Sequence, residues 1–184
     1  MIKRRIIVFI LLFALAFLAV RPVAAEDTPP GGLGEGDLKL GGGANTVSIT
    51  APNDITDWVL RSGDNSRASV FQVSADGDWK LSATDSDTVT TKGHMTEWYG
   101  GNYITSPKQL ENPMNVSAQT GGNVTAVYEV KLPAGGIIAL GGTTNLDEKN
   151  VEVAFKQPVS SIDEVLTDGH RYKIVVTFTI SSYP

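Results

Sequence analysis

The sequence predicts an all-β protein, built as a single antiparallel β-sandwich of about nine short strands. The first observation is strict alternation over 172–180, where every second side chain is apolar: Tyr172, Ile174, Val176, Phe178 and Ile180. A period of two directs one side of a strand into a core. The second observation is the regular spacing of turn-forming clusters such as Asp76-Gly77. The third is that no segment has the length and periodicity of a helix that could connect parallel strands.

The other predicted strands follow the same period of two. Alternation begins at Asn45, with Val47 and Ile49 apolar in a strand over 45–51. A strand over 124–132 places five apolar residues on one face: Val124, Ala126, Tyr128, Val130 and Leu132. Shorter strands are predicted at 55–60, 68–74, 78–83, 114–118, 136–140 and 150–156. Residues 162–166 alone predict a helical turn, which Ser160 or Ser161 could cap.

Residues 84–112 interrupt the pattern and predict a long connection that contains a hairpin. The segment 84–93 is polar, and the aromatic residues Trp98, Tyr99 and Tyr103 follow it around a glycine pair. Long connections on a β scaffold often carry binding surfaces. Flat rings beside polar groups are what a sugar-binding platform requires, so these three are candidate ligand-binding residues. Aromatic rings also hold long loops against a sheet, and both interpretations stay open.

Residues 1–25 have the pattern of a secretory signal peptide. Lys3, Arg4 and Arg5 precede an apolar run over 6–20, and a small-residue cleavage site follows at 23–25. The run has fifteen residues, whereas a membrane-spanning helix needs ~20, so we expect removal rather than retention as an anchor. The protein is therefore predicted to be secreted, and only an uncleaved signal segment would hold it in a membrane.

The chain is predicted to have three parts: the signal peptide 1–25, a leader 26–44 and the β-sandwich domain 45–184. The leader contains nine Gly or Pro residues and is predicted to be flexible. Removing 1–25 leaves 159 residues, enough for one domain with its own core. The formal charge of that part is −9, because the signal peptide carries four Lys/Arg and no acid. We therefore expect no nucleic-acid partner, since phosphates would repel it.

Cysteine is absent from the chain, so no disulfide can form in the compartment to which it is exported. Stability must then come from the core or from bound ions. Four aspartates at i, i+2 spacing in predicted turns are candidate calcium ligands: Asp76, Asp78, Asp85 and Asp87. Aspartate is also a common turn residue, and no run matches a twelve-residue calcium loop. No other cofactor is predicted.

The pattern Trp-x-Leu occurs twice, at 58–60 and 79–81. Residues i and i+2 of a strand share a face, so each pair places an indole beside an isobutyl group. Such pairs fill the core of a β-sandwich efficiently. The four residues concerned are Trp58, Leu60, Trp79 and Leu81.

The segment 70–83, which contains the second Trp-x-Leu, resembles the first signature of the WxL domain of secreted bacterial surface proteins. The second WxL signature lies in the last strand, where this chain has Phe178 and Ile180 in place of Trp and Leu. The segments 93–97, 157–159 and 163–166 are also similar to small secreted proteins of methanogenic archaea. These resemblances imply an extracellular β domain, and WxL domains attach non-covalently to the cell wall.

The sequence contains little that could support catalysis. His94 and His170 are its two histidines, and neither has a second histidine at i+2 or i+4 as zinc sites often do. The motifs Gly-x-Ser-x-Gly and His-Glu-x-x-His and a phosphate-binding loop are absent from the sequence. We therefore expect a protein that is not an enzyme.

Three functions remain open on the sequence. The first is a secreted, cell-surface-associated structural or ligand-binding protein whose partners are a cell-envelope polymer or surface proteins. The second is a self-assembling subunit of a surface filament or sheath, in which the N-terminal strand of one subunit completes the sheet of a neighbour. The third is an extracellular hydrolase.

Overall fold

The computed structural model describes residues 7–10, 46–56 and 58–183. Regular structure in this part of the chain consists of strands alone, so the predicted all-β class is confirmed. The predicted leader, and the predicted signal peptide apart from residues 7–10, lie outside the described residues. The strands are β1 (Ile7–Ile10), β2 (Val47–Thr50), β3 (Gly63–Ala75), β4 (Trp79–Asp85), β5 (Thr96–Tyr99), β6 (Asn102–Tyr103), β7 (Asn115–Ala118), β8 (Val124–Val127), β9 (Glu129–Lys131), β10 (Gly136–Gly141), β11 (Lys149–Val159) and β12 (Arg171–Ser182).

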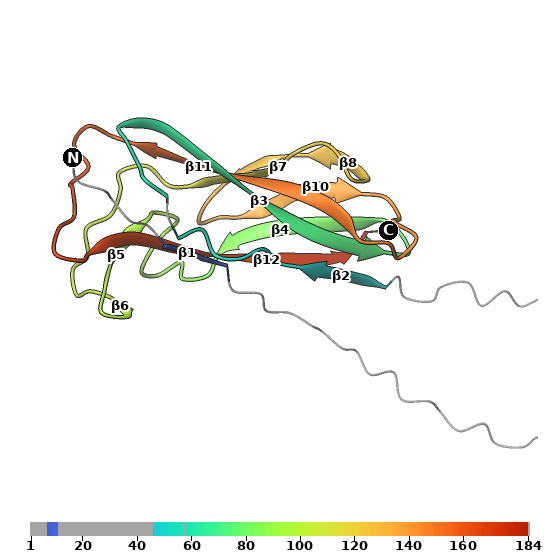
Figure 1. The fold of residues 1–184 in the computed structure, drawn as a ribbon, viewed down its shortest axis with the longest axis horizontal. Helices are drawn as coiled ribbons and strands as arrows, with labels where there is room; N and C mark the ends of the chain where they lie inside the picture. The colour runs from blue at the N-terminus through green and yellow to red at the C-terminus, as the bar shows by residue number, and fades with distance from the viewer. Residues whose placement is uncertain (1–6, 11–45, 57, 184) are drawn as a thin grey trace, which may run out of the picture.

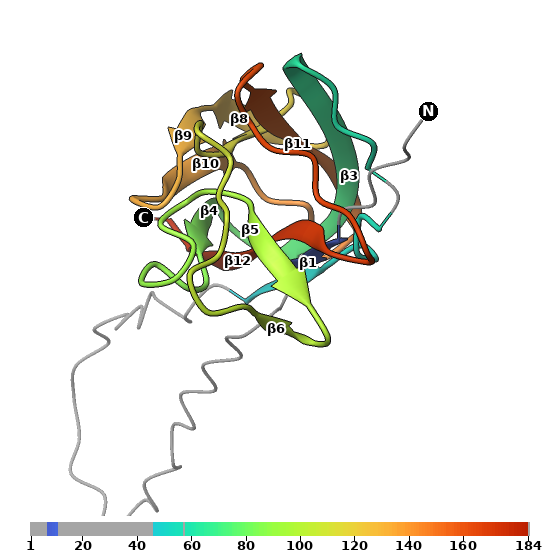
Figure 2. The ribbon, with the colours of Figure 1, turned by 90° about the vertical axis from the view of Figure 1, so that its left-hand side faces the viewer.

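These strands form two curled sheets (Figures 1 and 2). One has the order β6-β5-β12-β4-β10-β8, and β1 pairs with β12 outside this path. The other has the order β2-β3-β11-β7-β9. All pairings are antiparallel except that of β1 with β12, which is parallel.

Both sheets contribute to one hydrophobic core. Phe178 of β12 lies at its centre, with ring centroids 4.6 Å from Phe71 of β3 and 6.0 Å from Phe155 of β11. All three are at most 1% exposed. Burying each such ring stabilises the fold by about 1.5–3 kcal/mol relative to exposure. The alternation predicted for 172–180 is confirmed at Ile174, Val176 and Phe178, which are buried.

Three strands are longer than the sequence predicts. β3, β11 and β12 contain 13, 11 and 12 residues, whereas the predicted strands 68–74 and 150–156 cover only parts of the first two. The first half of β3 is mostly exposed and polar, yet residues 63–73 of β3 pair with β11 without interruption. Pairing with a partner strand therefore extends β3 beyond its apolar segment.

Three local predictions were wrong. The described residues of the predicted strand 55–60, which are 55, 56 and 58–60, belong to no strand of either sheet. The strand over 124–132 is divided at Tyr128 into β8 and β9, which belong to different sheets. Tyr128 is 48% exposed because the chain turns there from one sheet to the other. Residues 162–166 contain a turn and irregular chain in place of the predicted helical turn.

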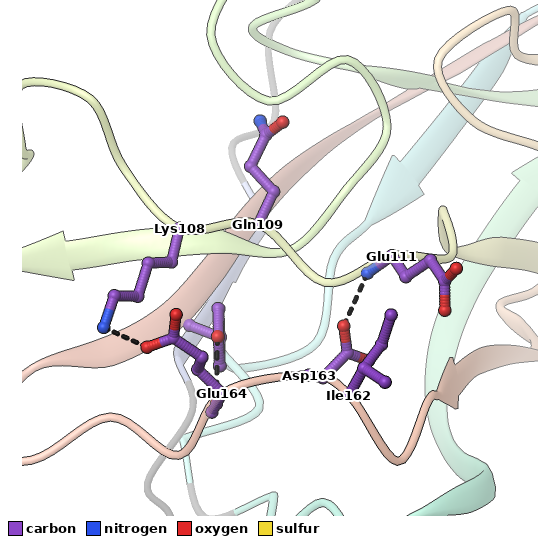
Figure 3. A pocket seen from close by; sticks show the side chains of 7 residues that line it. Lys108, Gln109, Glu111, Ile162, Asp163 and Glu164 are labelled. Carbon is purple, nitrogen blue, oxygen red and sulfur yellow. Dashed lines mark hydrogen bonds and ion pairs between the residues drawn. The ribbon is translucent and has the colours of Figure 1, made fainter.

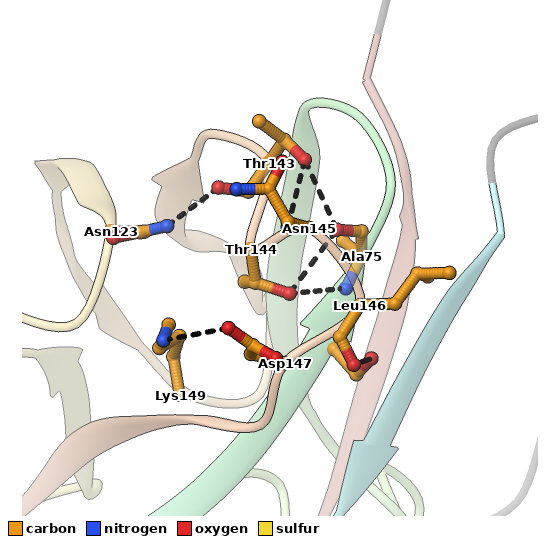
Figure 4. Close-up of polar contacts among 9 residues, drawn as sticks. Ala75, Asn123, Thr143, Thr144, Asn145, Leu146, Asp147 and Lys149 are labelled. Carbon is orange, nitrogen blue, oxygen red and sulfur yellow. Dashed lines mark hydrogen bonds and ion pairs between the residues drawn. The ribbon is translucent and has the colours of Figure 1, made fainter.

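One end of the molecule, which we name the turn end, is formed by the turn between β3 and β4 and the loop 142–147 (Figure 4). The Thr144 hydroxyl accepts a hydrogen bond from the Ala75 N–H at 2.8 Å and donates one to the Ala75 carbonyl at 3.1 Å. The Thr144 N–H donates to the same carbonyl at 2.9 Å. Thr144 is 1% exposed, so these bonds satisfy groups that water cannot reach.

Trp79 closes the core beside the turn end. Its indole N–H donates to the Gly142 carbonyl at 2.9 Å, and its ring lies close to the backbone of Gly141. A Cβ at position 141 would stand 2.0 Å from ring atom Cζ2. Only glycine leaves room for the indole here.

Candidate functional site

The opposite end of the molecule, which we name the hairpin end, carries the aromatic residues singled out in the sequence. It consists of β5, β6 and the loops 86–94, 104–113 and 160–170, and it faces the viewer in Figure 2. β5 and β6 form a hairpin with Trp98 opposite Tyr103 and Tyr99 opposite Asn102. Gly100 and Gly101 make the turn with φ of 60° and 94°, a region that favours glycine.

The three aromatic side chains divide between the two faces of this hairpin. Trp98 and Tyr99 are consecutive in a strand, so their side chains point to opposite faces. Trp98 and Tyr103 contact edge to face, with ring centroids 4.9 Å apart and an interplanar angle of 85°. The hairpin thus brings Trp98 and Tyr103 together and directs Tyr99 elsewhere.

On the face of the hairpin that carries Trp98, the indole contacts a positively charged side chain of the protein. Lys173 of β12 places its Nζ 3.5 Å from the centroid of the indole. Burial lowers the pKa of the Lys173 ammonium, with the nearby Asp54 charge acting in the opposite direction. The ring quadrupole attracts this ammonium and offsets part of its desolvation.

Tyr99 belongs to a second group on the other face. Its ring stacks on that of His170, with centroids 4.3 Å apart and an interplanar angle of 11°. His170 Nδ1 lies 2.7 Å from Glu97 Oε1, and Glu97 Oε2 accepts a hydrogen bond from the Lys108 N–H at 3.1 Å. Glu97 is buried, whereas Tyr99 is 51% exposed. Tyr99 is therefore the ring of the three that a ligand could contact most directly.

The phenol of Tyr103 is buried in the hairpin end, and its Oη has no hydrogen-bond partner among the described residues. Burial raises the pKa of Tyr103 well above its usual value, and the charges of Asp85 and Asp87 raise it further. An ionised phenolate is therefore unfavourable at this position.

The four candidate calcium ligands form two separate pairs at opposite ends of β4. Asp76 and Asp78 precede the strand, and Asp85 and Asp87 stand at its far end. Seven residues of strand span about 20 Å, too far for one ion to bind both pairs. Among the residues that the structure describes, His, Asp and Glu form no group of three or more that could hold a metal.

Asp85 and Asp87 instead bind the loop that follows β4. Asp85 is buried and accepts hydrogen bonds from the Thr91 hydroxyl at 2.5 Å and from the Gly93 N–H at 2.7 Å. Asp87 accepts from the Thr90 N–H at 2.9 Å, and this bond lowers the pKa of the Asp87 carboxyl. At the other end of β4, Asp76 accepts from the Thr46 N–H at 2.7 Å.

Both Trp-x-Leu pairs lie in the hydrophobic core, each residue being at most 3% exposed: Trp58, Leu60, Trp79 and Leu81. Trp79 and Leu81 share the inner face of β4, as their spacing predicts. The residue between the first pair, Val59, is 45% exposed, so the alternation persists outside a regular strand.

A cavity of about 280 Å³ at the hairpin end was not predicted from the sequence (Figure 3). Lys108 and Glu164 form an ion pair at its mouth, and Asp163 accepts hydrogen bonds from the Glu111 and Ser160 N–H groups, both at 2.7 Å. The Tyr172 hydroxyl donates to the Glu164 carbonyl at 3.0 Å. The bonds between the two loops join residues 52 and 56 positions apart, so no local motif could reveal the cavity.

A second cavity, of about 390 Å³, lies where β3 and β11 approach β7 and β9. Lys156 bridges it through an ion pair with Glu129 at 2.6 Å. Both partners are about half exposed, so this pair contributes little to stability. The cavity combines amide, hydroxyl and charged groups on the outer surface.

No protein-family model, curated protein or solved structure matches this chain. Nor does the described part of the chain contain a helix that is long and apolar enough to cross a membrane.

Proposed function

We propose that the protein is a secreted, non-enzymatic component of the cell envelope, in which the two sheets form a β-sandwich with a structural or ligand-binding role. The observation that carries this proposal is that the carboxylates at the hairpin end bind the loops of the protein itself. Asp85, Glu97 and Asp163 each bind main-chain N–H groups of neighbouring loops. The His94 ring likewise lies 2.7 Å from the Leu110 carbonyl.

This arrangement supports a scaffold that holds its loops in place. A general acid or base must reach a substrate within hydrogen-bond distance. The buried carboxylates of Asp85 and Glu97 instead bind main-chain N–H groups of the protein and, respectively, the Thr91 hydroxyl and the His170 ring. The exposed ring of Tyr99 is available to a ligand, and stacking on a sugar of an envelope polymer suits its shape and its exposure.

Cell fractionation tests the location. The protein is expected on washed cells, in a form that high salt or a chaotrope releases, because no covalent link is proposed. Recovery from cleared medium alone, with none on washed cells, would contradict an envelope role.

Retention on immobilised envelope polysaccharide tests ligand binding. Tyr99→Ala is expected to reduce retention several-fold, because the exposed ring supplies the contact. Tyr128→Ala is the matched control, since Tyr128 is 48% exposed and Tyr99 is 51% exposed, and they lie on different parts of the surface. If both variants are retained as well as the natural protein, ligand binding through Tyr99 is contradicted and only the structural role stays proposed.

A second function, a self-assembling subunit of a filament or sheath, is favoured by the position of β2. This N-terminal strand pairs with residues 72–75 of β3 at the edge of its sheet, and the rest of β3 extends past it. Electron microscopy of the mature protein tests assembly directly. Monomer alone in the natural mature protein would refute this function. Deleting residues 26–44 keeps β2 and is expected to abolish polymers while leaving soluble monomer, and polymers of the deleted form would show that assembly does not use the leader.

A further inference from the structure

β12 is paired differently along its two edges. On one edge, residues 176–182 pair with β4 in an uninterrupted antiparallel register. On the other edge, β5 pairs only with residues 171–173. Beyond that point, the strand that occupies this edge is β1, which runs parallel to residues 173–176. We name residues 174–176 on this side the acceptor edge, because Lys173 also pairs with Thr96 of β5.

The backbone orientation of β12 determines which N–H and C=O groups lie at the acceptor edge. The Val175 carbonyl accepts a hydrogen bond from the Ser86 N–H at 2.9 Å on the β4 side. Backbone groups of successive residues in a strand point to alternate edges. The N–H and C=O groups of Ile174 and Val176 therefore face the acceptor edge, where β1 lies.

The acceptor edge is preformed and apolar. The side chains of Ile174 and Val176 are fully buried in the core, which fixes the backbone between them. β2 of the other sheet also approaches β12, and Figure 1 shows β1 and β2 following one another along this strand. A segment added at the acceptor edge would therefore lie in line with the protein's own N-terminal strand.

The segment that occupies this edge comes from the predicted signal peptide. Residues 7–10 pair with it, and the sequence predicts that hydrolysis after Ala25 removes them. Without them, no strand of the described residues pairs with Ile174 and Val176 on this side. Unpaired strand edges bind further strands readily.

We propose that in the mature protein the acceptor edge receives a β-strand donated by a second copy of the chain, and that the donor segment is 36–41 of its leader. This inference rests on the proposed assembly function. In the donor sequence Gly-Asp-Leu-Lys-Leu-Gly, Leu38 and Leu40 are spaced to share one face of a strand. Residues 42–46, which join the donor segment to β2, can span about 17 Å when extended, so the donor can reach a molecule packed directly against this one.

Cysteine cross-linking tests the contact, because the chain has no cysteine of its own. Val175 lies on the outer face of β12, and Lys39 faces outward if the two leucines face the core. Mature V175C is mixed with mature K39C under mild oxidation, and a disulfide-linked heterodimer is expected. T125C is the matched control for the acceptor, since Thr125 is exposed on β8 at the far edge of the same sheet. It is expected to give at least tenfold less heterodimer with K39C.

Proline substitutions in the donor supply a second test that leaves the domain intact. Proline removes a backbone N–H and is poorly tolerated in a paired strand. Leu38→Pro and Leu40→Pro together are expected to abolish both polymers and the heterodimer with V175C. Gly32→Pro, outside the donor segment, is expected to leave both unchanged. Circular dichroism of each variant checks that the monomer is folded.

The outcomes separate this inference from the proposed function. Heterodimer formation that the proline pair abolishes supports the acceptor edge. If the Leu38→Pro, Leu40→Pro variant still forms polymers, or if the natural protein forms polymers but V175C and K39C give no heterodimer, the acceptor edge is overturned and the assembly function is retained. Absence of both polymers and heterodimer overturns the assembly function as well. A mature N-terminus at Met1 also overturns the inference, because β1 would then keep the edge.

Discussion

The turn end and the hairpin end lie at opposite ends of the molecule (Figure 1), and different chemistry holds them. At the turn end the buried bonds join uncharged groups, the Thr144 hydroxyl, the Trp79 indole and main-chain atoms. At the hairpin end the corresponding bonds involve Glu97, Asp85 and other titratable groups. The buried bonds of the turn end should therefore be insensitive to pH, whereas the stability of the hairpin end should depend on pH, because it holds Tyr103, whose pKa is raised by burial.

The largest expected effect is at the turn end. Gly141→Ala places a methyl group 2.0 Å from Trp79 Cζ2, so the indole or the backbone must move. Overpacking of this kind is expected to lower the free energy of unfolding by about 3 kcal/mol. Urea denaturation measures it. Gly142→Ala is the control, because its nearest new contact is Asp78 Oδ1 at 3.8 Å, and equal losses in both variants would contradict the role of Trp79.

The second prediction removes the buried hydroxyl at the turn end. Thr144→Val keeps the shape of the side chain but leaves the Ala75 N–H without its partner, at an expected cost of about 2 kcal/mol. Thr144→Ser should recover most of this loss. Thr143→Val is the control, since Thr143 is exposed and its hydroxyl lies at 3.3 Å from the same carbonyl. The loss should be the same at pH 5 and pH 8.

The two ends also differ in how far the sequence predicts them. The period of two predicts β12 and the inner face of β4, because burial on one side of a strand requires alternation. It cannot predict the first half of β3, whose polar residues are extended by pairing with β11. Likewise, the serine and threonine side chains of a loop give no sign of which will be buried. Thr144 and the exposed Thr143 are indistinguishable in the sequence.

At the hairpin end, the aromatic segment and its glycine pair predict a hairpin, and one is present. The contacts of its rings depend on the pairing of β5 with β12, strands more than 70 residues apart. Neither the stacking of Tyr99 on His170 nor the position of Lys173 over Trp98 could follow from local sequence. The role of these rings in ligand binding stays a prediction.

A third prediction concerns the buried carboxylate of the hairpin end. Glu97→Gln changes one carboxylate oxygen to an NH₂ group, so it can no longer accept from both the Lys108 N–H and His170. The free energy of unfolding is expected to fall by about 1.5 kcal/mol at pH 7. Glu111→Gln, on the exposed surface nearby, should change it by less than about 0.5 kcal/mol. Similar losses in both variants would show that the carboxylate has no special role.

The smallest expected effect is a loss of stability above pH 10 that originates at Tyr103 of the hairpin end. The folded state holds the pKa of Tyr103 above the ordinary value of 10.0, chiefly through burial, so it binds the phenol proton more tightly than the unfolded chain does. The contribution of Tyr103 is therefore complete below pH 10 and decreases as the pH rises further, by less than about 1.4 kcal/mol per pH unit. Tyr103→Phe should remove this loss.

Thermal unfolding between pH 8 and 11 measures the difference between Tyr103→Phe and the natural protein. The two should be close at pH 8, or the variant slightly more stable, because the phenol oxygen it lacks has no hydrogen-bond partner among the described residues. The gap should widen in favour of the variant above pH 10. Tyr128→Phe, at an exposed position, should follow the natural protein throughout. Parallel curves for Tyr103→Phe and the natural protein would mean that the phenol reaches water, and the hairpin end would then be as insensitive to alkali as the turn end.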